Sequence, residues 1–281
     1  MTMLKQRIER ANIIYHTQLS ETYDLQQPHF KPENVVQVTA RIKKFSFQTS
    51  GQRILDVGCG TGFMLKLARP YFMELYGVDI TPAMLAKAKN KFKNDRSGKI
   101  HLDLSSSEDL KFADRHFDVV SAYGFLHHLE RIEKTLSEAY RVLKKGGIFY
   151  SDQDPNYYFW KSMMSLKDPK GLSGLLNVER NAVCQMTKMV NKASSKNIVR
   201  EIVEMAEYQK MKGGFKEERI KQLLNKIGYR HINYEYAWFW QEGRVVHDLS
   251  PQAALYFEEH LRQALPLTRH LFKYIRIIAV K

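Results

Sequence analysis

The chain has 281 residues, of which 44% are hydrophobic and 26% are charged. These fractions exclude a disordered chain, and the length suits one large α/β domain with additions. The formal net charge of +14 is compatible with an acidic substrate or an anionic surface, but no uninterrupted basic run exceeds a pair such as Lys43-Lys44, so we expect no specific nucleic-acid partner.

The two cysteines, Cys59 and Cys184, form neither a disulfide framework nor a zinc-binding spacing. We therefore expect a reducing, cytoplasmic environment and no bound metal. Residues 1–10 lack the apolar core of a secretory signal, and no run approaches the ~20 apolar residues of a membrane-spanning helix.

The first 50 residues are predicted to form an N-terminal helical cap segment. Helices are expected over residues 1–20 and 34–47, and the loop between them, over 21–33, contains Pro28 and Pro32.

After Gly51 the pattern changes to short apolar runs separated by helical segments. Strands are predicted at 53–57, 75–79 and 100–104, and from 117 and 148 onward. Helices are predicted at 63–68, 81–92 and 132–143, the last one closed by Gly146-Gly147. This alternation predicts a doubly wound parallel sheet over residues 51–154, with a ligand crevice at the carboxyl ends of the strands.

Two insertions interrupt the rest of the chain. Residues 155–212 are predicted to be a helical cap over an acceptor site. Residues 213–281 complete the core with a helix at 216–227 and strands at 230–238 and 272–280. Between those strands lies a second insertion, at 241–270, with a helix from about 251 to 264.

A glycine-rich turn, residues 56–62, joins the first strand to its helix, and Asp79 ends the next strand. Such a turn lets a ligand approach the backbone, the helix N-terminus favours a negative group, and an acid at the position of Asp79 can accept both ribose hydroxyls. The spacing of Gly58, Gly60 and Gly62 fits neither the dinucleotide fingerprint nor a P-loop. A nucleoside site is predicted; a purely structural turn is the alternative.

At these residues the chain resembles the class I, Rossmann-like S-adenosylmethionine-dependent methyltransferases, and its motifs are closest to the small-molecule branch. Residues 54–62 look like the first motif of that family, and residues 76–81 look like the second. Residues 117–120, 126–129 and 141–147 look like its fourth-strand region and the segment before strand five. The resemblance implies a seven-stranded α/β sheet whose last strand is antiparallel, S-adenosyl-L-methionine as cofactor, and S-adenosylhomocysteine as product.

The resemblance also implies a set of cofactor-binding residues. They are Tyr23, Asp56, Gly58, Cys59, Gly60, Gly62, Asp79, Ile80, Met84, Ser106, Ser107, Glu108 and Ser121. Ser106 stands where the family often has the aspartate that holds the adenine amine. Adenine could therefore be held by the Ser106 hydroxyl, by the backbone at Ser107 or by Glu108.

Methyl transfer needs a base only when the acceptor is a hydroxyl or an activated carbon. His128 resembles the histidine base of some natural-product O-methyltransferases, which also use an aspartate after strand five; Asp152 and Asp154 lie in that region. A structural role for His128 is the alternative.

Aromatic residues at 157–160 and 234–240 suit a hydrophobic acceptor, or else they simply pack the insertions. We expect a small or medium-sized acceptor: a secondary metabolite, a quinone or a lipid-like molecule. An RNA or protein methyltransferase and a non-catalytic cofactor-binding module are the alternatives. Lysines in the first insertion would allow peripheral contact with an anionic membrane. They are Lys161, Lys167, Lys170, Lys188, Lys192 and Lys196.

Overall fold

The computed structural model describes residues 2–95, 99–165, 196–240 and 250–281. They contain a seven-stranded sheet in the order β3-β2-β1-β4-β5-β7-β6. Its strands are β1 (Arg53–Val57), β2 (Glu74–Asp79), β3 (Ile100–Leu104), β4 (Phe117–Tyr123), β5 (Leu143–Pro155), β6 (Arg230–Phe239) and β7 (Phe272–Val280). Strand β7 runs antiparallel to both β5 and β6, whereas β1 to β5 pair in parallel. The predicted doubly wound sheet with an antiparallel last strand is confirmed.

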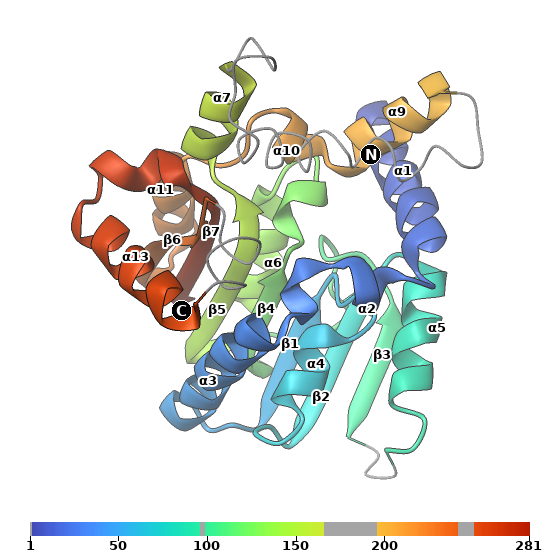
Figure 1. Cartoon of the computed structure of the whole chain (residues 1–281). Coiled ribbons are helices and arrows are strands. Elements are labelled where there is room, and N and C mark those ends of the chain that lie inside the picture. Colours follow the sequence, from blue (N-terminus) through green and yellow to red (C-terminus); the bar gives the residue numbers. More distant parts are fainter. Residues whose placement is uncertain (1, 96–98, 166–195, 241–249) are drawn as a thin grey trace.

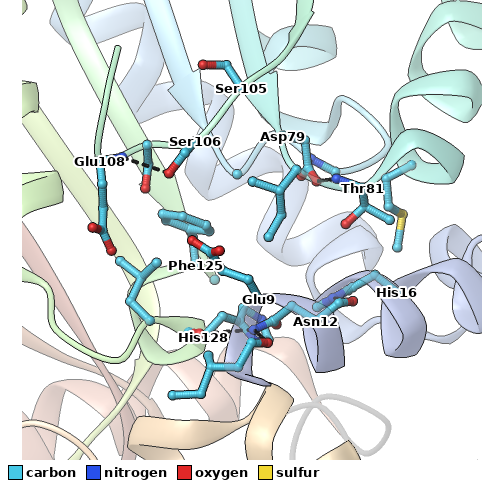
Figure 2. A pocket seen from close by; sticks show the side chains of 18 of the residues that line it. Glu9, Asn12, His16, Asp79, Thr81, Ser105, Ser106, Glu108, Phe125 and His128 are labelled. Atoms are coloured by element: carbon cyan, nitrogen blue, oxygen red, sulfur yellow. Dashed lines mark hydrogen bonds between the residues drawn. The ribbon is translucent and has the colours of Figure 1, made fainter. Parts of the chain in front are cut away.

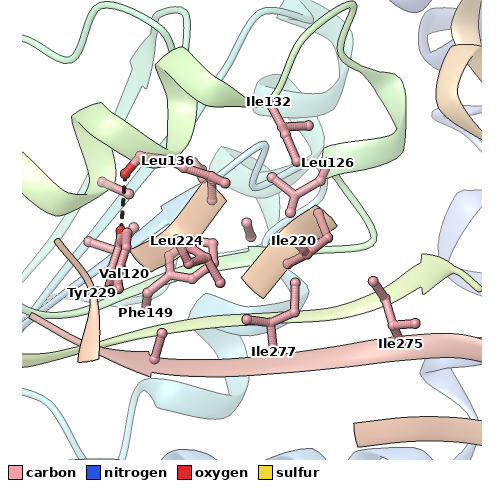
Figure 3. Packing of buried hydrophobic residues seen from close by; sticks show 14 of the residues in the cluster. Val120, Leu126, Ile132, Leu136, Phe149, Ile220, Leu224, Tyr229, Ile275 and Ile277 are labelled. Atoms are coloured by element: carbon pink, nitrogen blue, oxygen red, sulfur yellow. Dashed lines mark hydrogen bonds between the residues drawn. The ribbon is translucent and has the colours of Figure 1, made fainter. Parts of the chain in front are cut away.

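Helices cover both faces of this sheet (Figure 1). On one face lie α3 (Pro32–Gln48), α4 (Phe63–Ala68) and α5 (Pro82–Lys91); on the other lie α6 (Glu133–Val142) and α11 (Glu217–Ile227). Each face has its own apolar core because successive strand residues point to opposite sides. On the α6 and α11 face, Leu136 and Leu224 pack with Phe149 and Ile277 (Figure 3). Burial on both faces explains why the central strands β1 and β4 appear as continuous apolar runs in the sequence.

A third group of helices stands beyond the carboxyl ends of the strands. There α1 (Met3–Leu19) lies beside α9 (Lys196–Ala206), which is followed by α10 (Tyr208–Met211), and α7 (Tyr157–Ser165) lies on the far side of α10 from α1 (Figure 1). Tyr15 and Leu19 of α1 pack against Val203 and Ala206 of α9. Further helices are η2 (Leu126–His128), α13 (Pro251–Gln263) and η3 (Leu267–Leu271).

Two details differ from the sequence-based expectations. The predicted loop at 21–33 contains two short helices, α2 (Tyr23–Gln26) and η1 (Pro28–Phe30), because Pro28 occupies the first position of a helical turn after the extended residue Gln27. In addition, Gly146-Gly147 do not close α6: the chain is already extended at Leu143, which pairs with Phe117.

The glycines lie inside β5 instead, which therefore starts five residues earlier than expected. A Cβ on Gly147 would lie 2.9 Å from the carbonyl oxygen of Lys144 and 3.1 Å from that of Asp118, so the close approach of these backbones requires glycine.

Parts of both predicted insertions, residues 166–195 and 241–249, lie outside the described residues, and so do Lys167, Lys170, Lys188 and Lys192. A cap over the acceptor site therefore stays a prediction. Among the helices that are described, none is long and apolar enough to cross a membrane.

Candidate functional site

The glycine-rich turn follows β1 and is tied to the end of β2. The N–H groups of Gly58 and Cys59 both donate to the carbonyl oxygen of Val78, at 2.8 and 3.0 Å. Gly58 has φ +69°, and a Cβ there would lie 2.0 Å from the Phe125 ring. Gly60 has φ +51°, but a Cβ there would meet nothing within 4 Å. Gly58 is thus required both by packing and by its left-handed φ. At Gly60 only the left-handed φ disfavours a side chain, and the space beside it is open.

Asp79, at the end of β2, is held by two backbone groups. Its Oδ2 accepts a hydrogen bond from the Gly60 N–H at 2.9 Å, and its Oδ1 accepts one from the Thr81 N–H at 2.7 Å. Each carboxylate oxygen keeps a second lone pair. The carboxylate is therefore fixed beside the glycine turn and can still accept hydrogen bonds from a ligand.

A pocket opens at the carboxyl ends of β1, β2 and β4 (Figure 2). Most of the residues predicted from the sequence line it together: Tyr23, Gly58, Gly60, Asp79, Ile80, Met84, Ser106, Ser107, Glu108 and His128. In Figure 2, Ser106 and Glu108 lie across the pocket from Asp79 and Thr81, and Phe125 lies between them.

Helix α1 forms a wall of this pocket that the sequence analysis missed. Its lining residues are Lys5, Ile8, Glu9, Asn12 and His16. Lys5 Nζ lies 2.5 Å from Glu108 Oε2, and Asn12 Nδ2 donates to the carbonyl oxygens of Ile8 and His128, at 3.0 and 3.1 Å. Asn12 lies on the stripe of α1 that also buries Ile8 and Leu19. A polar residue at that spacing is the one sequence signal for this wall, although it does not predict what Asn12 contacts.

Four predicted cofactor residues, three in the turn itself and one in β4, are not among those that line the pocket. Buried Asp56 accepts a hydrogen bond from the Ser121 hydroxyl at 2.6 Å, and burial raises the pKa of Asp56 to about 7. Cys59 is buried, which raises the pKa of its thiol. Gly62, with φ +84°, is the N-cap of α4. These residues support the turn, and their direct contact with a cofactor stays a prediction.

The predicted catalytic aspartates are fully buried in β5 and do not line the pocket. Asp152 accepts hydrogen bonds from the Tyr150 hydroxyl at 2.8 Å and from Arg276 Nε at 2.5 Å. Asp154 accepts one from the Ser151 hydroxyl at 2.6 Å. Their catalytic roles also stay predictions.

His128 lines the pocket beside α1. Its Nδ1 lies 2.6 Å from the carbonyl oxygen of Ala206, and its ring meets that of His16 edge to face, with centroids 4.8 Å apart. Since a carbonyl can only accept, Nδ1 carries the proton and Nε2 keeps a free lone pair. Burial lowers the pKa of His128 well below its usual value, so the neutral ring is the stable form.

Next to His128 lies a second buried histidine, His127. Its Nδ1 is 2.9 Å from Asp154 Oδ1, and its Nε2 is 3.7 Å from Glu207 Oε2. Burial alone would raise the pKa of Glu207, but Lys210 and the two histidines lower it to about 2. Sequence reasoning missed Glu207, which lies in the first insertion and in no recognised motif.

Part of the chain is similar in sequence to known methyltransferases. Residues 55–151 match the protein family described as "Methyltransferase domain". The chain is 26% identical over 155 residues to phosphoethanolamine N-methyltransferase 2 of Caenorhabditis elegans, covering 49% of this chain and 36% of that one. It is 38% identical over 111 residues to the ubiquinone/menaquinone biosynthesis C-methyltransferase UbiE of a Geobacter species, covering 38% and 46%.

The fold is also similar to that of phosphoethanolamine N-methyltransferase 2 of Haemonchus contortus, which was solved in complex with S-adenosyl-L-methionine. The TM-score is 0.60 at 18% identity, over 100% of this chain and 60% of that one. This chain spans less than half the length of the two curated relatives.

Proposed function

We propose that the whole chain transfers a methyl group from S-adenosylmethionine to a small-molecule acceptor. The premise is that residues 55–151 match the methyltransferase domain family, whose class I members use this cofactor. The observation that carries the proposal is the Asp79 carboxylate, fixed by the Gly60 and Thr81 N–H groups at the rim of the pocket. Two carboxylate oxygens held in this way can accept hydrogen bonds from the two hydroxyls of a ribose.

We assign the rest of the cofactor site from the pocket lining. The open space beside Gly60 would take the amino-acid part of the cofactor. Ser106 and Glu108, which lie across the pocket from Asp79 in Figure 2, and the lining residue Ser107 would take the adenine. Of these, Glu108 is already paired with Lys5, which leaves the Ser106 hydroxyl and the Ser107 backbone as the better candidates.

The bound cofactor supplies an electrophilic methyl group on a good leaving group, so the protein has mainly to position the acceptor. Positioning of this kind is worth ~7–11 kcal/mol. Where the acceptor is a hydroxyl or an activated carbon, His128 is the proposed proton acceptor through its free Nε2. The lowered pKa of His128 makes it a weak base, which suits an acidic acceptor group.

We propose an acceptor of small or medium size with an apolar body, such as a quinone in its reduced, quinol form. Apolar residues Ile8, Phe125 and Leu129 line the pocket near His128, and one relative is named for C-methylation in quinone biosynthesis. An RNA acceptor is less favoured because Glu9 and Glu130 also line the pocket, and carboxylates repel a phosphate backbone.

The direct experiment measures S-adenosylhomocysteine release with a panel of acceptors. A short-chain demethylmenaquinone, kept chemically reduced as the quinol so that its ring carbon is nucleophilic, and phosphoethanolamine are the first two acceptors to compare, because they correspond to the two classes of relative. We expect turnover with the quinone that depends on Asp79. Tight cofactor binding without product formation from any acceptor would instead favour the non-catalytic module.

A further inference from the structure

His127, His128 and Glu207 form a compact group beside the cofactor pocket. Each residue offers one ligand atom, and the three atoms lie within 4.8 Å of one another. His127 Nε2 and Glu207 Oε2 are 3.7 Å apart. Two ligands of a tetrahedral zinc ion, each at ~2.0–2.1 Å, are separated by about 3.3 Å. A shift of a few tenths of an ångström would therefore let one ion contact both.

Both histidines are oriented as metal-binding histidines usually are. The Nδ1 of His127 is held by Asp154 and that of His128 by the carbonyl oxygen of Ala206. An acceptor at Nδ1 fixes the tautomer and leaves the Nε2 lone pair for an ion. Sequence spacing could not show this, because the partners lie 27 and 78 residues away.

Glu207 supplies a buried carboxylate beside these two histidines. Its residue exposure is 3%, and within the described part of the chain its Oε2 accepts no hydrogen bond. Lys210 Nζ lies 3.2 Å from that oxygen as an ion pair without hydrogen-bond alignment. Lys210 also approaches the Trp160 ring, at 5.0 Å from its centroid. A divalent ion would thus compete with Lys210 for the Glu207 oxygen.

We propose that His127, His128 and Glu207 bind a divalent transition-metal ion of the zinc class. Two imidazoles and one carboxylate are a known ligand set for such ions and leave further positions for water or substrate. The charges of Glu207 and Asp154 would together balance the ion. Because His128 also lines the pocket, the ion would sit at the edge of the acceptor site. While bound, the ion would occupy the His128 lone pair that the base role needs, so the base role proposed above belongs to the metal-free protein.

The test is direct binding of Zn²⁺ to the chelator-treated full chain, measured by competition with a chromophoric chelator, without cofactor or acceptor. We expect one equivalent to bind. Glu207→Gln, which keeps the shape of the side chain, and His127→Ala should each weaken binding at least ~10-fold, as loss of even an outer partner does. Lys210→Met should tighten binding, because it removes the competing cation.

Two controls separate this site from surface binding and from the proposed function. His101→Ala removes an exposed histidine and should leave Zn²⁺ affinity unchanged. Asp79→Ala should lose cofactor affinity but bind Zn²⁺ normally. If His127→Ala does not fold, Glu207→Gln alone decides. Absence of Zn²⁺ binding by both the wild type and Lys210→Met would overturn the proposal, as would equal affinity in Glu207→Gln.

Discussion

Replacing Asp79 with alanine should weaken S-adenosylmethionine binding more than any nearby surface change. The side chain accepts the N–H groups of Gly60 and Thr81 at 2.9 and 2.7 Å, and its remaining lone pairs face the pocket. A hydrogen bond to a charged group contributes ~1.5–3 kcal/mol, so losing one ribose contact predicts a loss of roughly 10- to 150-fold in affinity. A second lost contact would add to this.

Asparagine at this position is a sharper variant because its shape is unchanged. Its amide nitrogen must face one of the two backbone N–H donors, so one donor loses its acceptor. We expect Asp79→Asn to bind the cofactor nearly as weakly as Asp79→Ala in calorimetric titrations. Asp103→Asn, on the exposed side of the neighbouring strand, is the matched control. Wild-type affinity in Asp79→Asn would refute the assignment of this carboxylate to the ribose.

Three further predictions follow from other residues. Gly60→Val fills the open space beside the turn, so calorimetry should detect no cofactor binding. The circular dichroism spectrum should stay that of the folded protein. Normal binding would mean that the cofactor lies elsewhere. Burial raises the pKa of Asp56 to about 7 in the folded state, above its unfolded-state value. The buried carboxyl must therefore ionise as pH rises from about 4 to 7, and the protein loses stability over this range. Asp56→Asn should therefore raise the melting temperature at pH 8 more than at pH 5. An equal rise at both pH values would contradict the raised pKa of Asp56. Arg276→Met leaves buried Asp152 without its ion pair and also removes the contact with Glu235. The free energy of unfolding measured in urea should therefore fall by ~3–5 kcal/mol. A fall of less than ~1 kcal/mol would show that the other partners of Asp152 are sufficient.

Local patterns predicted the parts of the site that lie next to one another in the sequence. The turn at 56–62 and Asp79 were identifiable because each follows a buried strand, and parallel strands bring their carboxyl ends together. The site residues that were missed come from packing between distant segments. Asn12 reaches the His128 carbonyl across 116 residues, and Glu207 meets His127 from the far end of an insertion. Neither contact has a sequence period or motif that predicts it.

The burial of Asp152 and Asp154 was unpredictable for the same reason. Two acids at the end of a strand are typical of a catalytic pair, but Arg276 of β7 neutralises the first and His127 contacts the second. Only the pairing of β5 with β7 brings Arg276 to Asp152, and that pairing joins strands more than a hundred residues apart.

The position of β7 also constrains how the protein is made. Among the described strands, β6 pairs with β7 alone, and β7 separates it from β5. Of the seven strands, β7 is the last to leave the ribosome. Until it does, β5 and β6 each present an unpaired edge, and such edges template association between chains. A nascent or truncated chain that stops before Phe272 would therefore hold a complete glycine turn and Asp79, yet would be the form most prone to aggregate.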